Sequence, residues 1–166
     1  MVAVPKPTFL EERALIASGV SLIAGVDEAG SGSWAGPVYA AAVILPLDSR
    51  IGLVRDSKLL SAAQRERVAE AIKAKATAWA VGTASIEEIA ERNIRGAGAL
   101  AMLRAIQALA VGPQFVLIDA FRIPGLALPS KSIVQGDRKV KSIAAASIIA
   151  KTARDARSEE HTSELQ

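Results

Sequence analysis

The 166-residue sequence contains no cysteine and one histidine, His161, which lies in a polar C-terminal stretch. Without cysteine, the chain can form no disulfide, no thiolate nucleophile and no cysteine-ligated zinc or iron–sulfur site. With one histidine, a Ser-His-Asp triad and a multi-histidine metal site are not expected either. Catalysis by this chain would therefore depend on carboxylates, lysine, hydroxyl groups or a hard metal ion held by oxygen ligands.

Long apolar runs are scarce as well. The longest, 36–47, is too short to span a bilayer and contains two prolines. The N-terminus lacks the basic-then-apolar order of a signal peptide. With 51% hydrophobic and 22% charged residues, the composition is typical of a globular protein. We expect one soluble, cytoplasmic, monomeric domain without membrane association. The net charge of +3 is compatible with a polyanionic partner.

Helix-capping patterns occur at three places, where Ser or Thr is followed three residues later by Glu or Gln. The pairs are Thr8–Glu11, Ser61–Gln64 and Ser85–Glu88. They predict helices over 8–18, 61–75 and 85–110. In the last of these, Gly96 and Gly98 predict a kink or close packing.

Apolar and β-branched runs predict the strands. They lie at 22–26, 38–45, 78–84, 115–118 and 132–135. An Ala/Ile-rich segment predicts a final helix that starts near Lys141 and continues past Ile149. Because strands come first and alternate with helices later, we predict an α/β fold, a mixed sheet with helices packed on it.

Four acidic residues are placed where a strand gives way to a loop: Asp27, Glu28, Asp119 and Asp137. Functional side chains gather beyond strand ends in α/β sheets. Clustered carboxylates repel one another unless a proton or cation neutralises them, and oxygen-only ligands select Mg²⁺ or Mn²⁺. The acids therefore predict a site for two-metal hydrolysis of a phosphodiester. The alternative is that each acid merely occupies a turn.

One geometric condition applies to the first two acids. Neighbouring residues on a regular strand point to opposite faces of the sheet. Asp27 and Glu28 can therefore share a site only if the strand ends or bulges there. Gly30 and Gly32, just beyond, favour such a break.

A glycine-rich stretch follows the first strand. Residues 30–35 match the dinucleotide-binding pattern G-x-G-x-x-A, but that pattern should open a helix, and 37–44 has the composition of a strand. The stretch is therefore either a tight hairpin or a loop whose amides approach a phosphate or sugar. Asp56-Ser57-Lys58 is similarly either a turn or a segment that places Lys58 near a phosphate.

Five segments carry a family resemblance through their order and spacing: 24–30, 35–38, 56–61, 117–119 and 136–151. On these segments the chain, over about 7–156, resembles ribonuclease HII, the type 2 ribonuclease H family. The resemblance implies a ribonuclease H-like fold, a five-stranded mixed sheet flanked by helices. It also implies endonucleolytic cleavage of RNA in RNA–DNA hybrids, including single ribonucleotides embedded in duplex DNA. Cleavage on the 5′ side of the ribonucleotide would leave 3′-hydroxyl and 5′-phosphate ends.

The resemblance also implies the site residues. The family's four metal-binding acids, which hold two Mn²⁺ or Mg²⁺ ions, fall on Asp27, Glu28, Asp119 and Asp137. Asp155 is a second choice for the fourth ligand, because an acid beside Arg154 on a helix is commonly ion-paired or solvated.

Contacts to nucleic acid are implied for Gly30, Ser31, Gly32 and Lys58. The family usually has Gly-Arg-Gly where this chain has Gly30-Ser31-Gly32. A serine hydroxyl cannot replace a guanidinium. We therefore expect metal binding to survive this difference, and affinity and selectivity for the RNA–DNA junction to fall.

The last ten residues do not continue the family pattern. We interpret 157–166 as the translation of a short-read sequencing adapter and 1–156 as a catalytic domain that is incomplete at its C-terminus. Without 157–166 the chain would have 19 basic and 14 acidic residues, a net charge of +5. The alternative function is a truncated, catalytically weak or inactive domain that only binds nucleic acid.

Overall fold

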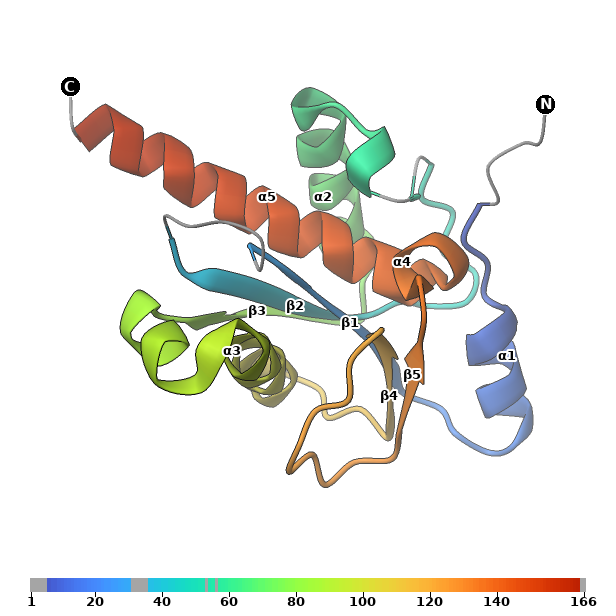
Figure 1. The fold of residues 1–166 in the computed structure, drawn as a ribbon. Coiled ribbons are helices and arrows are strands. Elements are labelled where there is room, and N and C mark those ends of the chain that lie inside the picture. The colour runs from blue at the N-terminus through green and yellow to red at the C-terminus, as the bar shows by residue number, and fades with distance from the viewer. Residues whose placement is uncertain (1–5, 31–35, 53, 56, 165–166) are drawn as a thin grey trace.

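The computed structural model describes residues 6–30, 36–52, 54–55 and 57–164. Its centre is a five-stranded sheet with the strand order β3-β2-β1-β4-β5 (Figure 1). The strands are β1 (Ile23–Ala29), β2 (Val38–Ile44), β3 (Ala78–Ala84), β4 (Phe115–Asp119) and β5 (Ser130–Ile133). The pairs β1–β2 and β2–β3 are antiparallel, whereas β1–β4 and β4–β5 are parallel. The prediction of a mixed sheet is confirmed.

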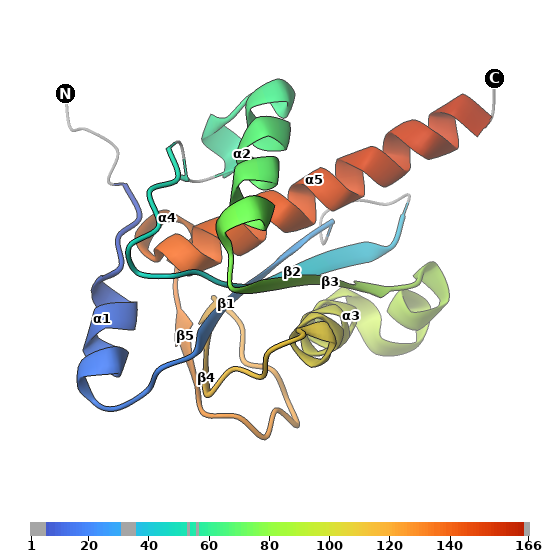
Figure 2. The same ribbon diagram turned by 180° about the vertical axis from the view of Figure 1, so that it is seen from behind.

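Helices cover both faces of the sheet. They are α1 (Leu10–Ala17), α2 (Ala62–Lys75), α3 (Ile86–Ala108), α4 (Gly136–Lys139) and α5 (Lys141–Glu164), with a 3₁₀ turn, η1 (Ser57–Leu59), before α2. Figures 1 and 2 show α3 on one face, and α5 with α2 on the other. None of the helices in the described ranges is both long and apolar enough to cross a bilayer.

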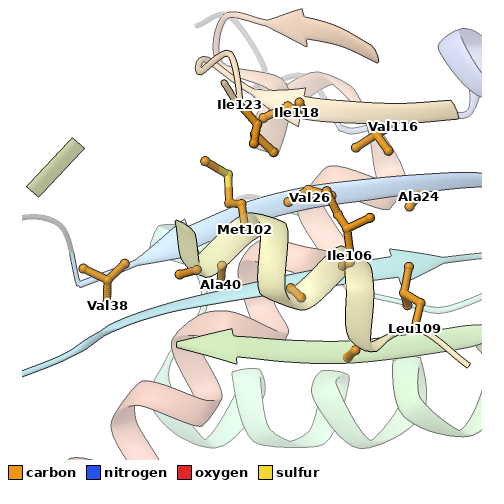
Figure 3. Close-up of a cluster of buried hydrophobic side chains, with 14 of the residues drawn as sticks. Ala24, Val26, Val38, Ala40, Met102, Ile106, Leu109, Val116, Ile118 and Ile123 are labelled. Atoms are coloured by element: carbon orange, nitrogen blue, oxygen red, sulfur yellow. The ribbon is translucent and has the colours of Figure 1, made fainter. Parts of the chain in front are cut away.

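Alternation along the strands divides the core between these faces. On β1, Ala24 and Val26 are fully buried and pack with Met102 and Ile106 of α3 (Figure 3). Gly25, between them, faces α5, and a Cβ there would overlap the backbone of Ser142. The missing side chain at this position lets α5 lie directly on β1.

Two of the three predicted capping boxes are confirmed. At the start of α2, the Gln64 amide donates to Ser61 Oγ at 3.2 Å, and the Ser61 amide donates to Gln64 Oε1 at 2.9 Å. Ser85 and Glu88 make the same reciprocal pair at the start of α3. These boxes are local in sequence, which is why the pattern alone identifies them.

The box predicted at Thr8 is wrong. Helix α1 begins after Phe9, which makes no side-chain cap hydrogen bond. Glu11, the expected partner of Thr8, instead forms an ion pair of 3.0 Å with Lys131 of β5. A tertiary contact has replaced the local one.

The kink in α3 and the bounds of other elements differ from those predicted. The kink in α3 falls at Asn93, with φ of 63°, rather than at the glycines, because Asn93 Oδ1 accepts from the Gly96 amide at 2.9 Å and restarts the helix. Strand β5 starts two residues earlier than predicted, and α4 was not predicted. Helix α5 continues to Glu164, and our interpretation of 157–166 stays a prediction.

Candidate metal centre

Parallel pairing of β1 and β4 brings two of the predicted acids together. Val26 of β1 is in register with Ile118 of β4, and the next residue of each strand is the acid, Asp27 or Asp119. Val26 and Ile118 face α3, so the alternation of a strand directs both acids to the face that α5 covers. The placement follows from the parallel register, because the residues that follow a paired position on two parallel strands lie side by side on the same face.

The third acid, Asp137, comes from the four-residue helix α4 rather than from a loop. Its amide donates to Asp119 Oδ1 at 3.3 Å. The preceding Gly136 permits this approach, because a Cβ there would lie 3.3 Å from Asp119 Oδ1 and 2.7 Å from the side chain of Ile143. One carboxylate oxygen each from Asp27, Asp119 and Asp137 lies within 4.8 Å of the others.

Mutual repulsion and burial make this cluster costly without a cation. Asp27 is 6% exposed, and burial raises its pKa well above the usual range, with the charges of Asp119 and Asp137 raising it further. The Glu28 amide, which donates to Asp27 Oδ1 at 2.8 Å, acts in the opposite direction. Three converging carboxylates with no nitrogen or sulfur donor among them fit a hard divalent cation such as Mg²⁺ or Mn²⁺.

Glu28 stands apart from these three acids. We expected β1 to end or bulge there, but its register with β2 is unbroken from Gly25–Val43 to Ala29–Tyr39. Glu28 therefore points to the opposite face from Asp27, and its Cγ lies 3.9 Å from where a Cβ on Gly98 of α3 would be. Glu28 still lines the same cavity as the three acids.

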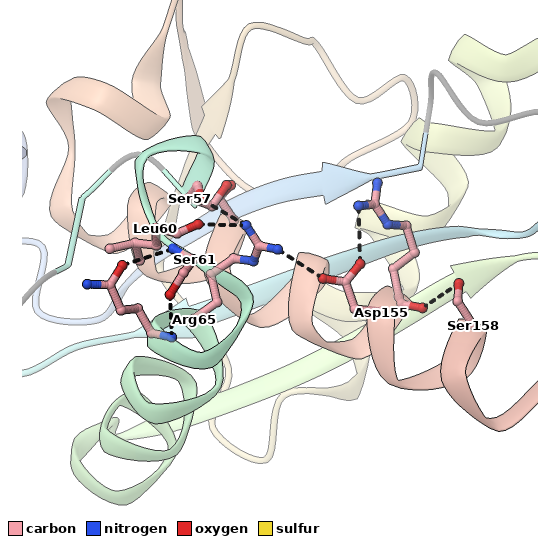
Figure 4. Close-up of polar contacts among 9 residues, drawn as sticks. Ser57, Leu60, Ser61, Arg65, Asp155 and Ser158 are labelled. Atoms are coloured by element: carbon pink, nitrogen blue, oxygen red, sulfur yellow. Dashed lines mark hydrogen bonds and ion pairs between the residues drawn. The ribbon is translucent and has the colours of Figure 1, made fainter. Parts of the chain in front are cut away.

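Asp155 lies outside the three-acid cluster, in an ion-pair network with two arginines. Its carboxylate is 3.3 Å from Arg65 of α2 and 3.3 Å from Arg154 (Figure 4). The pairing with Arg154 is the one expected for an acid on a helix surface.

A cavity of about 240 Å³ opens over the acids, and cationic side chains form part of its wall. Lys58 Nζ is 3.9 Å from Asp137 Oδ2, and its side chain is 60% exposed. Lys151 and Arg154 of α5 also line the cavity, together with Ser147. The sequence patterns predicted no role for these three residues in the site. Their i, i+4, i+7 spacing on one helix face is the signal that could have identified them.

The glycine-rich stretch is only partly within the described residues. Gly30 has φ of +100°, the left-handed region that favours glycine, and a Cβ there would lie 3.2 Å from Pro37 O. Ser31 and Gly32, like Asp56, lie outside the described residues. The predicted contacts of Gly30, Ser31, Gly32 and Lys58 with nucleic acid stay predictions.

Comparison with known proteins agrees with this architecture. The structure is similar to that of ribonuclease H2 from Pyrococcus horikoshii, with a TM-score of 0.76 and 27% identity, over 87% of this chain and 77% of that one. The fold is therefore of the ribonuclease H class. The family model for ribonuclease HII matches residues 24–166, and the chain belongs to that family.

Curated ribonuclease HII proteins show the closer sequence similarity. The protein from Anaeromyxobacter sp. (strain Fw109-5) is 55% identical over 137 residues, which are 82% of this chain and 44% of that protein. The protein from Myxococcus xanthus is 52% identical over 145 residues, 87% of this chain and 50% of that protein. The chain thus spans about half the length of these two relatives.

Proposed function

We propose that this chain is the catalytic part of a metal-dependent endoribonuclease that cleaves RNA in RNA–DNA hybrids, including single ribonucleotides embedded in duplex DNA. The observation that carries the proposal is the convergence of carboxylates from β1, β4 and α4 within 4.8 Å, in a chain of the ribonuclease HII family. The products would be 3′-hydroxyl and 5′-phosphate ends.

The proposed metal ligands are Asp27, Asp119 and Asp137, with Glu28, which lines the same cavity, as the fourth acid. Two Mn²⁺ or Mg²⁺ ions bound there would lower the pKa of a water molecule and stabilise the charge that develops on the leaving oxygen. Asp155 is not included, because Arg65 and Arg154 already compensate its charge.

The side chains prepare the site in two ways. Asp27 and Asp119 each accept a backbone amide hydrogen bond, at 2.8 and 3.3 Å, so their carboxylates are already oriented. The cations that line the cavity, Lys58, Lys151 and Arg154, would attract the phosphates on either side of the scissile bond. The acids would thus act in cleavage, and the cationic side chains would bind the substrate.

Recognition of the ribonucleotide is assigned to Gly30, Ser31 and Gly32, with Lys58 on the neighbouring turn. The left-handed conformation of Gly30 is consistent with a loop whose backbone approaches a ligand closely. Because Ser31 replaces the arginine usual in the family, the proposal includes weaker binding of the RNA–DNA junction. It also includes a monomeric state and a cytoplasmic location.

One assay tests the proposal. The chain is incubated with duplex DNA that carries a single ribonucleotide, with and without Mn²⁺, beside the variants Asp27→Asn and Asp48→Asn. Asp48 is exposed in a turn after β2 and serves as the matched control. We expect nicking that requires Mn²⁺, survives Asp48→Asn and disappears with Asp27→Asn. Binding of the duplex without nicking at any Mn²⁺ concentration would support the alternative, a domain that only binds nucleic acid.

A further inference from the structure

The N-terminal segment, residues 8–12, lies outside the part of the chain that matches the family model, which begins at residue 24. Figures 1 and 2 both show α1, where this segment continues, beside α4 and the start of α5. Helix α4 carries Asp137, one of the three converging acids. The segment is therefore close to the element that completes the proposed metal centre.

Backbone hydrogen bonds join the segment to the junction of α4 and α5. The Thr8 amide donates to Lys139 O at 3.1 Å, and the Lys141 amide donates to Thr8 O at 3.0 Å. These two bonds lie on either side of Val140, with which Thr8 forms a parallel bridge. Thr8 is thus hydrogen-bonded both to the end of α4 and to the first residue of α5.

Glu12 adds a side-chain hydrogen bond to the same junction. It is 3% exposed, and its Oε2 accepts from the Ser142 amide at 3.2 Å. Amides in the first turn of a helix have no acceptor within the helix. Thr8 and Glu12 thus supply acceptors for the first two amides of α5.

The position of Asp137 depends on this junction, because α4 is too short to be stable alone. At one end, the Asp137 amide donates to Asp119 Oδ1. At the other end, the Val140 amide donates to Gly136 O at 2.8 Å and closes the turn. The N-terminal segment fixes Val140 through the parallel bridge between Thr8 and Val140. A displacement of Val140 would therefore move Asp137 relative to Asp27 and Asp119.

We propose that Glu12 is a positioning residue for the metal centre: by accepting from the Ser142 amide, it fixes the junction of α4 and α5 and holds Asp137 in the three-acid cluster. This inference rests on the proposed function, because it assumes that the cluster binds divalent ions. Its action requires an acceptor oxygen at position 12 rather than a negative charge.

The test is a titration of the full chain with Mn²⁺ alone, in which free Mn²⁺ is measured by electron paramagnetic resonance. We expect Glu12→Ala to weaken the affinity for Mn²⁺ by about tenfold, as is usual when a group that orients a metal ligand is removed. Glu12→Gln keeps an acceptor oxygen and should restore most of the affinity. Equal losses in the two variants would contradict the acceptor role.

Glu88→Ala is the matched control. Glu88 accepts from the Ser85 amide at the start of α3, on the opposite face of the sheet, so its removal also uncaps a helix. We expect Glu88→Ala to lower the melting temperature and to leave the Mn²⁺ affinity unchanged. A fall in affinity as large as that of Glu12→Ala would show a general effect of destabilisation and overturn the inference.

The remaining outcomes separate this inference from the proposed function. If the wild-type chain and Glu12→Ala bind Mn²⁺ equally, the inference is wrong and the proposed metal centre stands. If the wild-type chain does not bind Mn²⁺, or if Asp27→Asn does not abolish its binding, the proposed metal centre is wrong, and the inference is wrong with it. If Glu12→Ala does not fold by circular dichroism, Glu12→Asp replaces it, because the shorter side chain withdraws the carboxylate from Ser142. Wild-type affinity in that variant would overturn the inference.

Discussion

Arg65 and Asp155 are 90 residues apart in the sequence, and their guanidinium and carboxylate groups lie 3.3 Å apart (Figure 4). The same guanidinium donates to the carbonyl oxygens of Ser57 at 3.3 Å and Leu60 at 3.0 Å. Ser57 Oγ also lies 3.0 Å from Ser147 Oγ of α5. Arg65 therefore joins α5 to the turn that carries Lys58.

Replacing Arg65 should affect substrate binding more than the cleavage step. In Arg65→Lys, one ammonium group replaces the planar guanidinium that donates to three acceptors. The turn with Lys58 should therefore lose its fixed position. We expect the KM for a ribonucleotide-containing duplex to rise several-fold, with a smaller change in kcat. Lys73→Ala is the control, because Lys73 pairs with exposed Glu70 on the same helix. An unchanged KM in Arg65→Lys would contradict this role.

Asp27→Asn should make the metal-free chain more stable while abolishing cleavage. The buried carboxylate of Asp27 faces two other acids, and burial and these charges raise its pKa. An amide removes the charge and keeps an oxygen to accept from Glu28. We expect a gain of about 1–3 kcal/mol in the free energy of unfolding at neutral pH, measured by urea denaturation without divalent ions. A loss of stability would mean that another group already neutralises Asp27.

The pH dependence of stability should reveal the buried Glu12. Burial raises the pKa of Glu12 above its usual value of 4.5, so the fold favours the protonated form. This contribution to stability is present at and below pH 4.5 and is lost as the pH rises through the raised pKa. Urea denaturation from pH 4.5 to 7.5 should therefore show that the wild-type chain loses stability relative to Glu12→Gln. A difference that stays constant over this range would refute the expectation.

Gly25→Ala should be strongly destabilising. The added methyl group would overlap the backbone of Ser142 and Ile143, and neither the strand nor the helix can shift without disturbing the core. We expect a loss of at least about 2 kcal/mol in urea denaturation, in the range for overpacked cores. Gly52→Ala is the matched control, because a Cβ at Gly52 would have no heavy atom within 4 Å. Similar stability of the two variants would show that α5 can move away from β1.

Ser31→Arg tests the departure from the family pattern. The guanidinium should strengthen contact with the nucleic-acid backbone and raise cleavage of a duplex with one embedded ribonucleotide. Metal dependence should stay the same. The measurement is the nicking rate at limiting substrate, with Ser33→Arg as a control for added charge. No gain over the wild-type chain, or an equal gain in Ser33→Arg, would argue against a specific role for position 31.

Local patterns in the sequence predicted more of this molecule than long-range ones. The capping boxes at Ser61 and Ser85 involve residues three apart, and the position of Asp119 at the end of β4 follows from the apolar run before it. The expected break in β1 at Glu28 was wrong, because only the register with β2 shows that β1 continues past it.

Contacts between distant segments could not be predicted from patterns in the sequence. Glu11 was expected to cap its own helix, but Lys131, which pairs with it, is 120 residues away. The hydrogen bond from the Ser142 amide to Glu12 spans 130 residues, and that from Arg65 to Asp155 spans 90. Each depends on how α1 is placed beside β5 and α5, or α2 beside α5, and no spacing rule within one element determines that placement.

Helix α5 limits how freely parts of this domain can be exchanged between relatives. One continuous helix carries Ser142, Ser147 and Asp155, which contact three segments of the chain: α1, the turn at Ser57, and α2. Because a helix rises 1.5 Å per residue, these contacts are spread over about 20 Å of one rigid element. A chimera that takes α5 from one family member should therefore fold and bind metal only if residues 8–12 and 57–65 come from the same parent.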